Sequence, residues 1–152
     1  MIIRKFNQED AAQTATLIQK ALIQVNSRDY SSKIIGHLVQ AYTAERLVEL
    51  AAEREIFVAV EDQMILGTAS LAGDTIYTVF VHPDHHGRGI GTELMEAIES
   101  RASEKGIQTV SLPSSTTAYQ FYQRLGYREV KRVQSDEHGM NIIMTKGLKD
   151  CG

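Results

Sequence analysis

The stretch His86-Gly87-Arg88-Gly89-Ile90-Gly91 decides the fold, because it joins a segment of strand character to a segment of helical character. The β-branched and aromatic run Thr75–Val81 precedes it and predicts a strand. After it, apolar residues recur at three- and four-residue steps up to Ala102, and Lys105-Gly106 suits a helix end. A glycine-rich turn at a helix start presents several backbone N–H groups with no β-carbons in front of them. The stretch is therefore predicted to bind an anion.

A further strand, residues 109–112, follows this helix. A strand, a crossover helix and a second strand form a right-handed unit in which the two strands run parallel. In such sheets ligands bind beyond the carboxyl ends of the strands. We therefore expect a ligand where Thr75–Val81 ends and the glycine turn begins.

The rest of the chain adds helices before this unit and antiparallel strands on both sides of it. Asn7, Thr43 and one of Ser31 or Ser32 are typical helix caps, and β-rich runs joined by short polar turns predict hairpins. We expect a single domain over residues 1–147 and a flexible tail over residues 148–152. The predicted strands are 2–6, 56–60, 64–71, 75–81, 109–112, 127–133 and 140–145, and the predicted helices lie near 11–25, 34–39, 47–51, 90–102 and 116–125.

The composition fits one globular domain, with 152 residues of which 43% are hydrophobic and 23% charged. A net charge of −3 provides no attraction to nucleic acid or to an anionic membrane. The one cysteine, Cys151, cannot close an internal disulfide, and the first residues turn charged without a signal-like apolar run. No apolar run is long enough to span a bilayer. We therefore expect a cytoplasmic protein that binds neither nucleic acid nor membrane.

Spacing argues against two nucleotide-binding interpretations of the glycine turn. A P-loop needs Lys-Ser or Lys-Thr after the last glycine, whereas Thr92-Glu93 follows Gly91. A dinucleotide fingerprint needs glycine or alanine where Thr92 stands, and an acidic residue about 20 positions further on, which is absent. A turn that merely closes the strand–helix connection is the simplest remaining alternative.

Two segments together resemble the GNAT acyltransferase superfamily. Residues 81–94 are similar to its coenzyme A signature, which is Gln or Arg, two residues, Gly, one residue, and Gly or Ala. Gly89 and Gly91 occupy the glycine positions, and His86 stands in place of Gln or Arg. Ala118-Tyr119-Gln120-Phe121-Tyr122-Gln123-Arg124-Leu125-Gly126-Tyr127 is similar to the family's Ala-x-x-Phe-Tyr-x-x-x-Gly-Phe segment. The resemblance spans nearly the whole chain and is sharpest between residues 79 and 127.

This resemblance implies an α/β fold of the α+β type, with a mixed, mostly antiparallel sheet of about six to seven strands and helices on both faces. It implies that Thr75–Val81 splays from its parallel neighbour and that acetyl-CoA, as co-substrate, occupies the resulting cleft. Ser115 stands where relatives often carry an asparagine that contacts the pantetheine arm, although a plain helix cap explains it equally well. The expected coenzyme contacts are Phe80, Val81, His86, Gly87, Arg88, Gly89, Ile90, Gly91, Thr92, Ser115 and Ala118.

Acyl transfer from a thioester to an amine needs an uncharged nucleophile, stabilisation of an oxyanion and a proton for the departing thiolate. Tyr122 matches the family's tyrosine that points at the coenzyme sulfur, so we predict it to be the general acid; core packing is the alternative. The strand Thr75–Val81 lacks the glutamate that many relatives use as a base. His82 is the candidate base, and Glu53 or Glu55 acting through water, or no dedicated base, are alternatives.

The cluster of His82, His85 and His86 also suggests a metal site, but it lacks a fourth ligand and a carboxylate pattern, so we predict no metal. Asp29 and Tyr30 fall in the loop that borders the acceptor cleft of relatives. We predict them to contact the substrate, with an ordinary surface turn as the alternative.

The predicted activity is transfer of an acetyl group from acetyl-CoA to a primary amine, by direct attack in a ternary complex. The acceptor is expected to be a small molecule or a peptide, and the resemblance also suggests a homodimer. The alternative is a sensor that binds acyl-CoA and transfers nothing.

Overall fold

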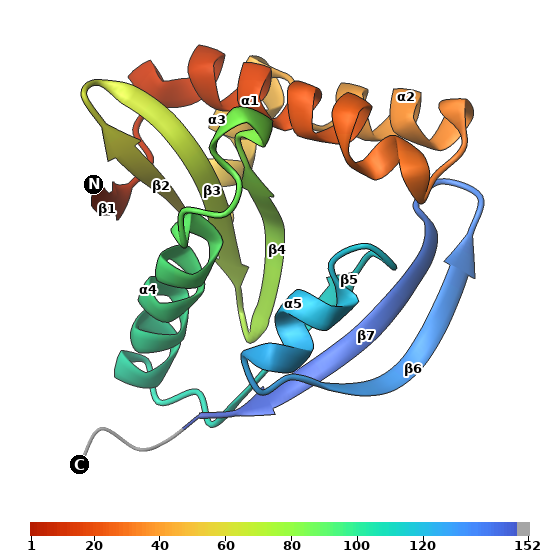
Figure 1. Cartoon of the computed structure of the whole chain (residues 1–152). Helices are drawn as coiled ribbons and strands as arrows, with labels where there is room; N and C mark the ends of the chain where they lie inside the picture. Colours follow the sequence, from red (N-terminus) through yellow and green to blue (C-terminus); the bar gives the residue numbers. More distant parts are fainter. Residues whose placement is uncertain (149–152) are drawn as a thin grey trace.

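The computed structural model describes residues 1–148 (Figure 1). Three helices precede the central strands, a long helix lies between two parallel strands, and a short helix leads into a closing hairpin. The elements are β1 (Ile2–Lys5), α1 (Ala11–Gln24), α2 (Ser32–Ala41), α3 (Ala44–Ala51), β2 (Glu55–Glu61), β3 (Met64–Ala72), β4 (Thr75–Val81), α4 (Ile90–Glu104), β5 (Thr109–Ser114), α5 (Tyr119–Arg124), β6 (Arg128–Ser135) and β7 (Gly139–Gly147).

The strands form one seven-stranded sheet in the order β1-β2-β3-β4-β5-β7-β6. Every neighbouring pair is antiparallel except β4 and β5, which run parallel, as the strand–helix–strand pattern predicts. These two strands share a single register pair, Thr75 with Ser111, at their starts. Beyond that pair they separate, so the sheet opens toward the carboxyl end of β4 (Figure 1). The expected fold class is thus confirmed, including the splayed parallel pair.

Helices cover both faces of the sheet, because consecutive strand residues point to opposite sides. Val58 and Ala59 are both fully buried, yet Val58 packs with Leu17 of α1, whereas Ala59 belongs to the larger core around α4. That larger core also includes Leu94 of α4 and residues of β5 and β7. Figure 1 shows α1 and α3 on one side of β2–β4 and α4 on the other.

The predicted caps account for three helix starts. Asn7 begins the chain's first helical turn, Ser31 accepts a hydrogen bond from the N–H of Ile34, and Thr43 accepts one from the N–H of Arg46. The last helix differs from the prediction: residues 116–118 form a turn, and α5 begins at Tyr119. At the C-terminus, the N–H of Leu148 donates to Gln108, and the other residues of the expected tail lie outside the described part.

Glu55 is the first residue of β2 and lies beside the C-terminal end of α4, which is the end remote from the glycine turn. Its carboxylate contacts Arg101 at 2.8 Å, Lys105 at 3.0 Å and Lys5 at 3.1 Å. Burial would raise the pKa of Glu55, but hydrogen bonds from these three cations lower it to about 2. A carboxylate with such a low pKa is a poor proton acceptor, so Glu55 is ill suited to the role of base considered above.

Glu55→Gln is expected to destabilise the fold at neutral pH. A carboxylate whose pKa is lower in the folded state than in the unfolded state stabilises the fold at pH values above its unfolded pKa. That stabilisation is lost as the pH falls through the folded pKa. The free energies of unfolding of wild type and variant should therefore differ at pH 7, and the difference should shrink as the pH falls from about 4.5 to about 2. Urea denaturation across this range measures the two free energies of unfolding. A difference between them that does not change with pH would contradict the ion-pair explanation.

Candidate functional site

The glycine turn forms the start of α4 and leaves open space in front of it. Gly87 and Gly89 have φ values of +82° and +79°, in the left-handed region that glycine adopts readily. A β-carbon built on either residue would meet no other heavy atom within 4 Å. The first N–H groups of a helix have no intrahelical acceptor and carry its positive end. The turn therefore has the geometry of an anion site.

The side chains within the turn mostly point to other parts of the protein. Arg88 donates from one terminal nitrogen to both carboxylate oxygens of Glu61, at 2.8 and 2.9 Å, and its other terminal nitrogen lies 2.9 Å from Nδ1 of His85. This pairing with Arg88 lowers the pKa of Glu61. His86 places Nε2 3.3 Å from the carbonyl oxygen of Val81. The guanidinium of Arg88 is thus already paired within the protein, although 43% of the side chain is exposed.

The end of β4 is bent by a bulge. Ser70 pairs with Tyr77 and Thr68 with Phe80, so two residues, Thr78 and Val79, lie opposite Ala69. Thr78 has a φ of +57°, a rare conformation for a β-branched residue. Its hydroxyl oxygen is buried and has no hydrogen-bond partner among the described residues. Strain of this kind is concentrated at functional sites, and here it redirects β4 where it leaves β5.

Tyr122 lies buried on α5, close to the glycine turn. Its ring packs edge-on against Phe121 at 5.1 Å and Tyr127 at 5.9 Å between centroids, and 6% of the residue is exposed. Burial, and then the nearby Tyr30, raise the pKa of its hydroxyl. A β-carbon on Gly91 would come within 3.1 Å of the Phe121 ring, so α5 packs directly on the first turn of α4. The fold thus packs the short helix that carries Tyr122 against the start of α4.

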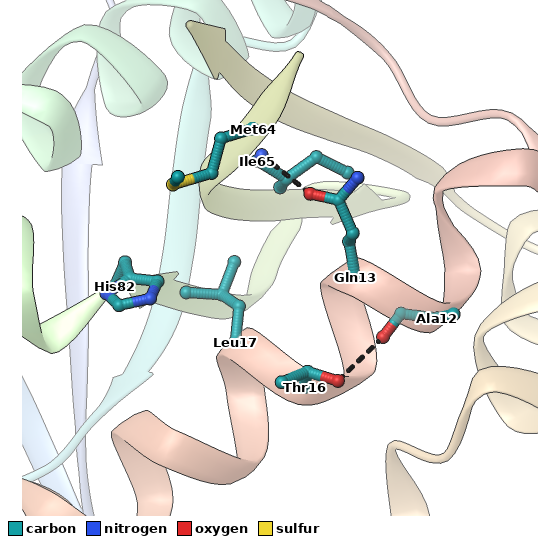
Figure 2. A pocket seen from close by; sticks show the side chains of 7 residues that line it. All are labelled: Ala12, Gln13, Thr16, Leu17, Met64, Ile65 and His82. Carbon is teal, nitrogen blue, oxygen red and sulfur yellow. Dashed lines mark hydrogen bonds between the residues drawn. The ribbon is translucent and has the colours of Figure 1, made fainter. Parts of the chain in front are cut away.

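His82 faces a different part of the molecule. Its Nδ1 accepts the N–H of Asp84 at 3.2 Å, and burial lowers the pKa of the imidazole. The imidazole lines a pocket of about 260 Å³. Figure 2 shows the ring pointing toward Leu17 of α1. The remaining lining residues come from α1 and β3: Ala12, Gln13, Thr16, Met64 and Ile65. None belongs to β5 or α5, so this pocket does not join His82 to Tyr122.

The segment before α5 is held by side-chain hydrogen bonds. The Ser115 hydroxyl accepts the N–H of Ala118 at 3.2 Å, so it caps the turn at residues 116–118 and not α5 itself, whose N-cap is Ala118. Asp29 Oδ1 accepts both the N–H and the hydroxyl of Thr117, at 3.2 and 2.8 Å. The loop after α1 is therefore fastened to the loop before α5.

Tyr30 extends this connection to the closing hairpin. Its hydroxyl donates to Oδ1 of Asn141 at 3.2 Å, and its pKa is raised to about 12, first by burial and then by Asp29. The ring lies directly over Gly139. Thr117 and Asn141 had no distinguishing signal in the sequence, because their importance comes from partners 88 and 111 residues away.

Gly139→Ala is expected to lower the free energy of unfolding by about 3 kcal/mol. Gly139 has a φ of +68°, and the new β-carbon would lie 2.6 Å from the Tyr30 ring. The estimate combines left-handed strain with overpacking. Gly73→Ala is a matched control, since Gly73 has a φ of +61° with no atom within 4 Å, and we expect about 1 kcal/mol there. Equal losses in urea denaturation would show that Tyr30 does not pack on Gly139.

The described residues include no helix that is both long and apolar enough to cross a membrane. They also contain no group of three or more His, Cys, Asp or Glu side chains arranged to hold a metal ion.

Comparisons with known proteins identify the family. The model of the acetyltransferase (GNAT) domain matches residues 24–148. The peptidyl-lysine N-acetyltransferase YjaB of Salmonella typhimurium is 29% identical over 74% of this chain and 77% of its own length. A GCN5-related N-acetyltransferase from Rhodopseudomonas palustris superposes with a TM-score of 0.89 at 30% identity, covering 97% of this chain and 95% of the other.

The PaiA N-acetyltransferase of Thermoplasma acidophilum, solved in complex with coenzyme A, has a TM-score of 0.81 at 19% identity, covering 96% and 98% of the two chains. At that identity the likeness shows the fold alone. The match of the domain model over most of the chain shows the family: this protein belongs to the GNAT acetyltransferases. Its class is that of an N-acetyltransferase, which confirms the predicted type of enzyme.

Proposed function

We propose that this enzyme transfers an acetyl group from acetyl-CoA to a primary amine, by direct attack within a ternary complex. The observation that carries the proposal is the opening between β4 and β5 beside an unobstructed anion-binding turn. A pyrophosphate fits the N–H groups of such a turn. The extended pantetheine arm fits a strand edge that has no neighbouring strand. The coenzyme A complex of PaiA, which has the same fold, supports this arrangement.

In the proposed complex, coenzyme contacts come from the turn and the end of β4. The backbone of Phe80 and Val81 binds the pantetheine arm, and a backbone N–H there stabilises the oxyanion. The N–H groups of residues 87–92 bind the pyrophosphate, and His86 and Arg88 border it. Ser115 and Ala118 flank the arm on the α5 side.

The proposed reaction forms a C–N bond and breaks the C–S bond of the thioester. The neutral amine attacks the carbonyl carbon, and the tetrahedral oxyanion collapses to release the thiolate of coenzyme A. Tyr122 donates its proton to this thiolate, because burial keeps the phenol protonated at neutral pH. The excess proton of the amine leaves to His82 or to solvent. A lowered pKa keeps His82 neutral and able to accept a proton, although its pocket lies on the α1 side.

The acceptor is proposed to be a primary amine on a small molecule or on a peptide lysine. The name of YjaB, a peptidyl-lysine N-acetyltransferase, supports the second of these. The proposed contacts with the acceptor are Asp29 and Tyr30, which lie at the loop that joins α1 to α2.

The test is release of free thiol from acetyl-CoA in the presence of a panel of amines. The proposal predicts that free thiol is released only when both acetyl-CoA and an amine are present, and that mass spectrometry detects the acetylated amine. A sensor would bind acetyl-CoA in calorimetry and release no amine-dependent thiol. Tighter binding of ATP or NAD than of coenzyme A would contradict the coenzyme assignment.

A further inference from the structure

The loop between α1 and α2 is hydrogen-bonded to segments that follow and flank β5, the strand from which β4 separates. Asp29 reaches Thr117 before α5, and Tyr30 reaches Asn141 on β7. These hydrogen bonds connect the N-terminal helices to the half of the sheet on the far side of the opening. They place Asp29 and Tyr30 between the N-terminal helices and that half of the sheet.

Asp29 uses only one of its two carboxylate oxygens in these contacts. Oδ1 accepts two hydrogen bonds from Thr117, whereas Oδ2 is buried and has no hydrogen-bond partner within residues 1–148. A buried carboxylate oxygen without a donor is costly, and such atoms are normally paired by protein, water or ligand. Oδ2 is therefore an acceptor prepared for a donor that the described chain does not provide.

The surroundings of Asp29 connect it to the candidate acid. The negative charge of Asp29 contributes to the raised pKa of Tyr30, and Tyr30 in turn contributes to that of Tyr122. Asp29 and Tyr30 are consecutive residues of the same loop. Asp29 makes no ion pair with a lysine or arginine of the described residues. Its charge is thus uncompensated within reach of the site.

We infer that Oδ2 of Asp29 binds an ammonium group of the acceptor, and that the preferred acceptors are amines with a second, cationic amino group. The inference rests on the proposed function and names its substrate class. The amine that attacks the thioester must be neutral, so it cannot remain an ammonium ion paired with Asp29. The bound cation is therefore a second amino group of the same molecule, as in an aliphatic diamine.

The test compares aliphatic diamines with monoamines of the same chain length. Wild type should show kcat/KM at least tenfold higher for diamines, the size expected for a hydrogen bond to a charged group. Asp29→Asn retains an oxygen for Thr117 but replaces the second oxygen by an amide NH₂, which cannot accept from an ammonium. It should abolish the preference by lowering kcat/KM for diamines at least tenfold and for monoamines less than about threefold.

Thr117→Val is the matched control for the structural role of Asp29. It removes the hydroxyl donor to Oδ1 while the carboxylate charge stays, so both amine classes should lose activity equally and the preference for diamines should persist. A wild type without preference would overturn the inference. So would equal losses for both amine classes in Asp29→Asn, because that result indicates a purely structural carboxylate.

A binding measurement separates this inference from the proposed reaction. Calorimetry of 1,4-diaminobutane with the coenzyme A-loaded protein should give at least tenfold weaker binding in Asp29→Asn than in wild type. This readout needs no turnover. Diamine binding that depends on Asp29 without thiol release would contradict the proposed reaction and support the cation site. Amine-dependent turnover, together with diamine binding that is the same in Asp29→Asn as in wild type, would support the proposed reaction and contradict the cation site.

Discussion

Tyr122→Phe is expected to lower kcat about a hundredfold and to leave the Kd for acetyl-CoA nearly unchanged. Proton transfer by a positioned side chain typically contributes a factor of about 100 to 10,000. The substitution removes only the hydroxyl and retains the ring that packs between Phe121 and Tyr127. Steady-state kinetics with a saturating amine and calorimetry with coenzyme A measure the two quantities separately.

The pH dependence gives this prediction a second readout. Because burial raises the pKa of Tyr122 above its ordinary value of 10.0, the phenol stays protonated throughout the neutral and moderately alkaline range. The wild-type kcat should therefore show no decline up to about pH 10 from loss of the acid. A decline centred near neutral pH that disappears in Tyr122→Phe would mean that the phenol titrates much lower than its burial implies.

Tyr127→Phe is the matched control for the loss of a buried phenol. Its hydroxyl donates to Glu99 of α4 at 2.8 Å, and the same carboxylate accepts from Lys146. This variant should lose stability, by about 1 kcal/mol for one hydrogen bond, and keep kcat within about threefold. If Tyr122→Phe retains full kcat while chemistry is shown to limit turnover, Tyr122 is not the acid.

The local features of the fold could be predicted from the sequence because their causes lie within a few residues. The apolar spacing of α4, the caps Ser31 and Thr43, and the polar turns between β-rich runs each act over one helical turn or one hairpin. The parallel β4–β5 pair followed from the handedness of crossover connections, which depends on element order alone. The start of α5 was placed three residues too early, since Ser115 caps a turn at Ala118 before the helix begins at Tyr119.

The site was less accessible to prediction, because it depends on contacts between distant segments. The glycine turn and Tyr122 have local motifs, and the structure brings their helices into contact through Gly91 and Phe121. The left-handed Thr78 has no local signature, since a β-branched residue in a strand favours extended backbone. Neither the partner of Arg88, Glu61, nor the partner of Asp29, Thr117, follows from spacing. Only the assembled sheet places these residues side by side.

Gly89→Asp is expected to weaken coenzyme A binding at least a hundredfold while the protein stays folded. Aspartate is among the residues that tolerate the left-handed φ of +79° at this position, and it is a favourable helix N-cap. A β-carbon there meets no atom within 4 Å, so the new side chain fits the turn. Its carboxylate would lie in the space proposed for the pyrophosphate. Two like charges about 4 Å apart at a protein surface repel by roughly 4 kcal/mol before salt screening.

Gly89→Asn separates this charge effect from the effect of a side chain. Asparagine has nearly the same shape, also adopts left-handed backbone and also caps helices, but it is neutral. It should weaken coenzyme A binding only about threefold. The difference in Kd for coenzyme A between Gly89→Asp and Gly89→Asn should become smaller as ionic strength rises. Calorimetry at two salt concentrations, with urea denaturation to verify folding, provides the comparison. Equal weakening would mean that the backbone shape of the turn, rather than its positive potential, determines binding. Unchanged binding in both variants would place the pyrophosphate elsewhere and overturn the assignment of residues 87–92.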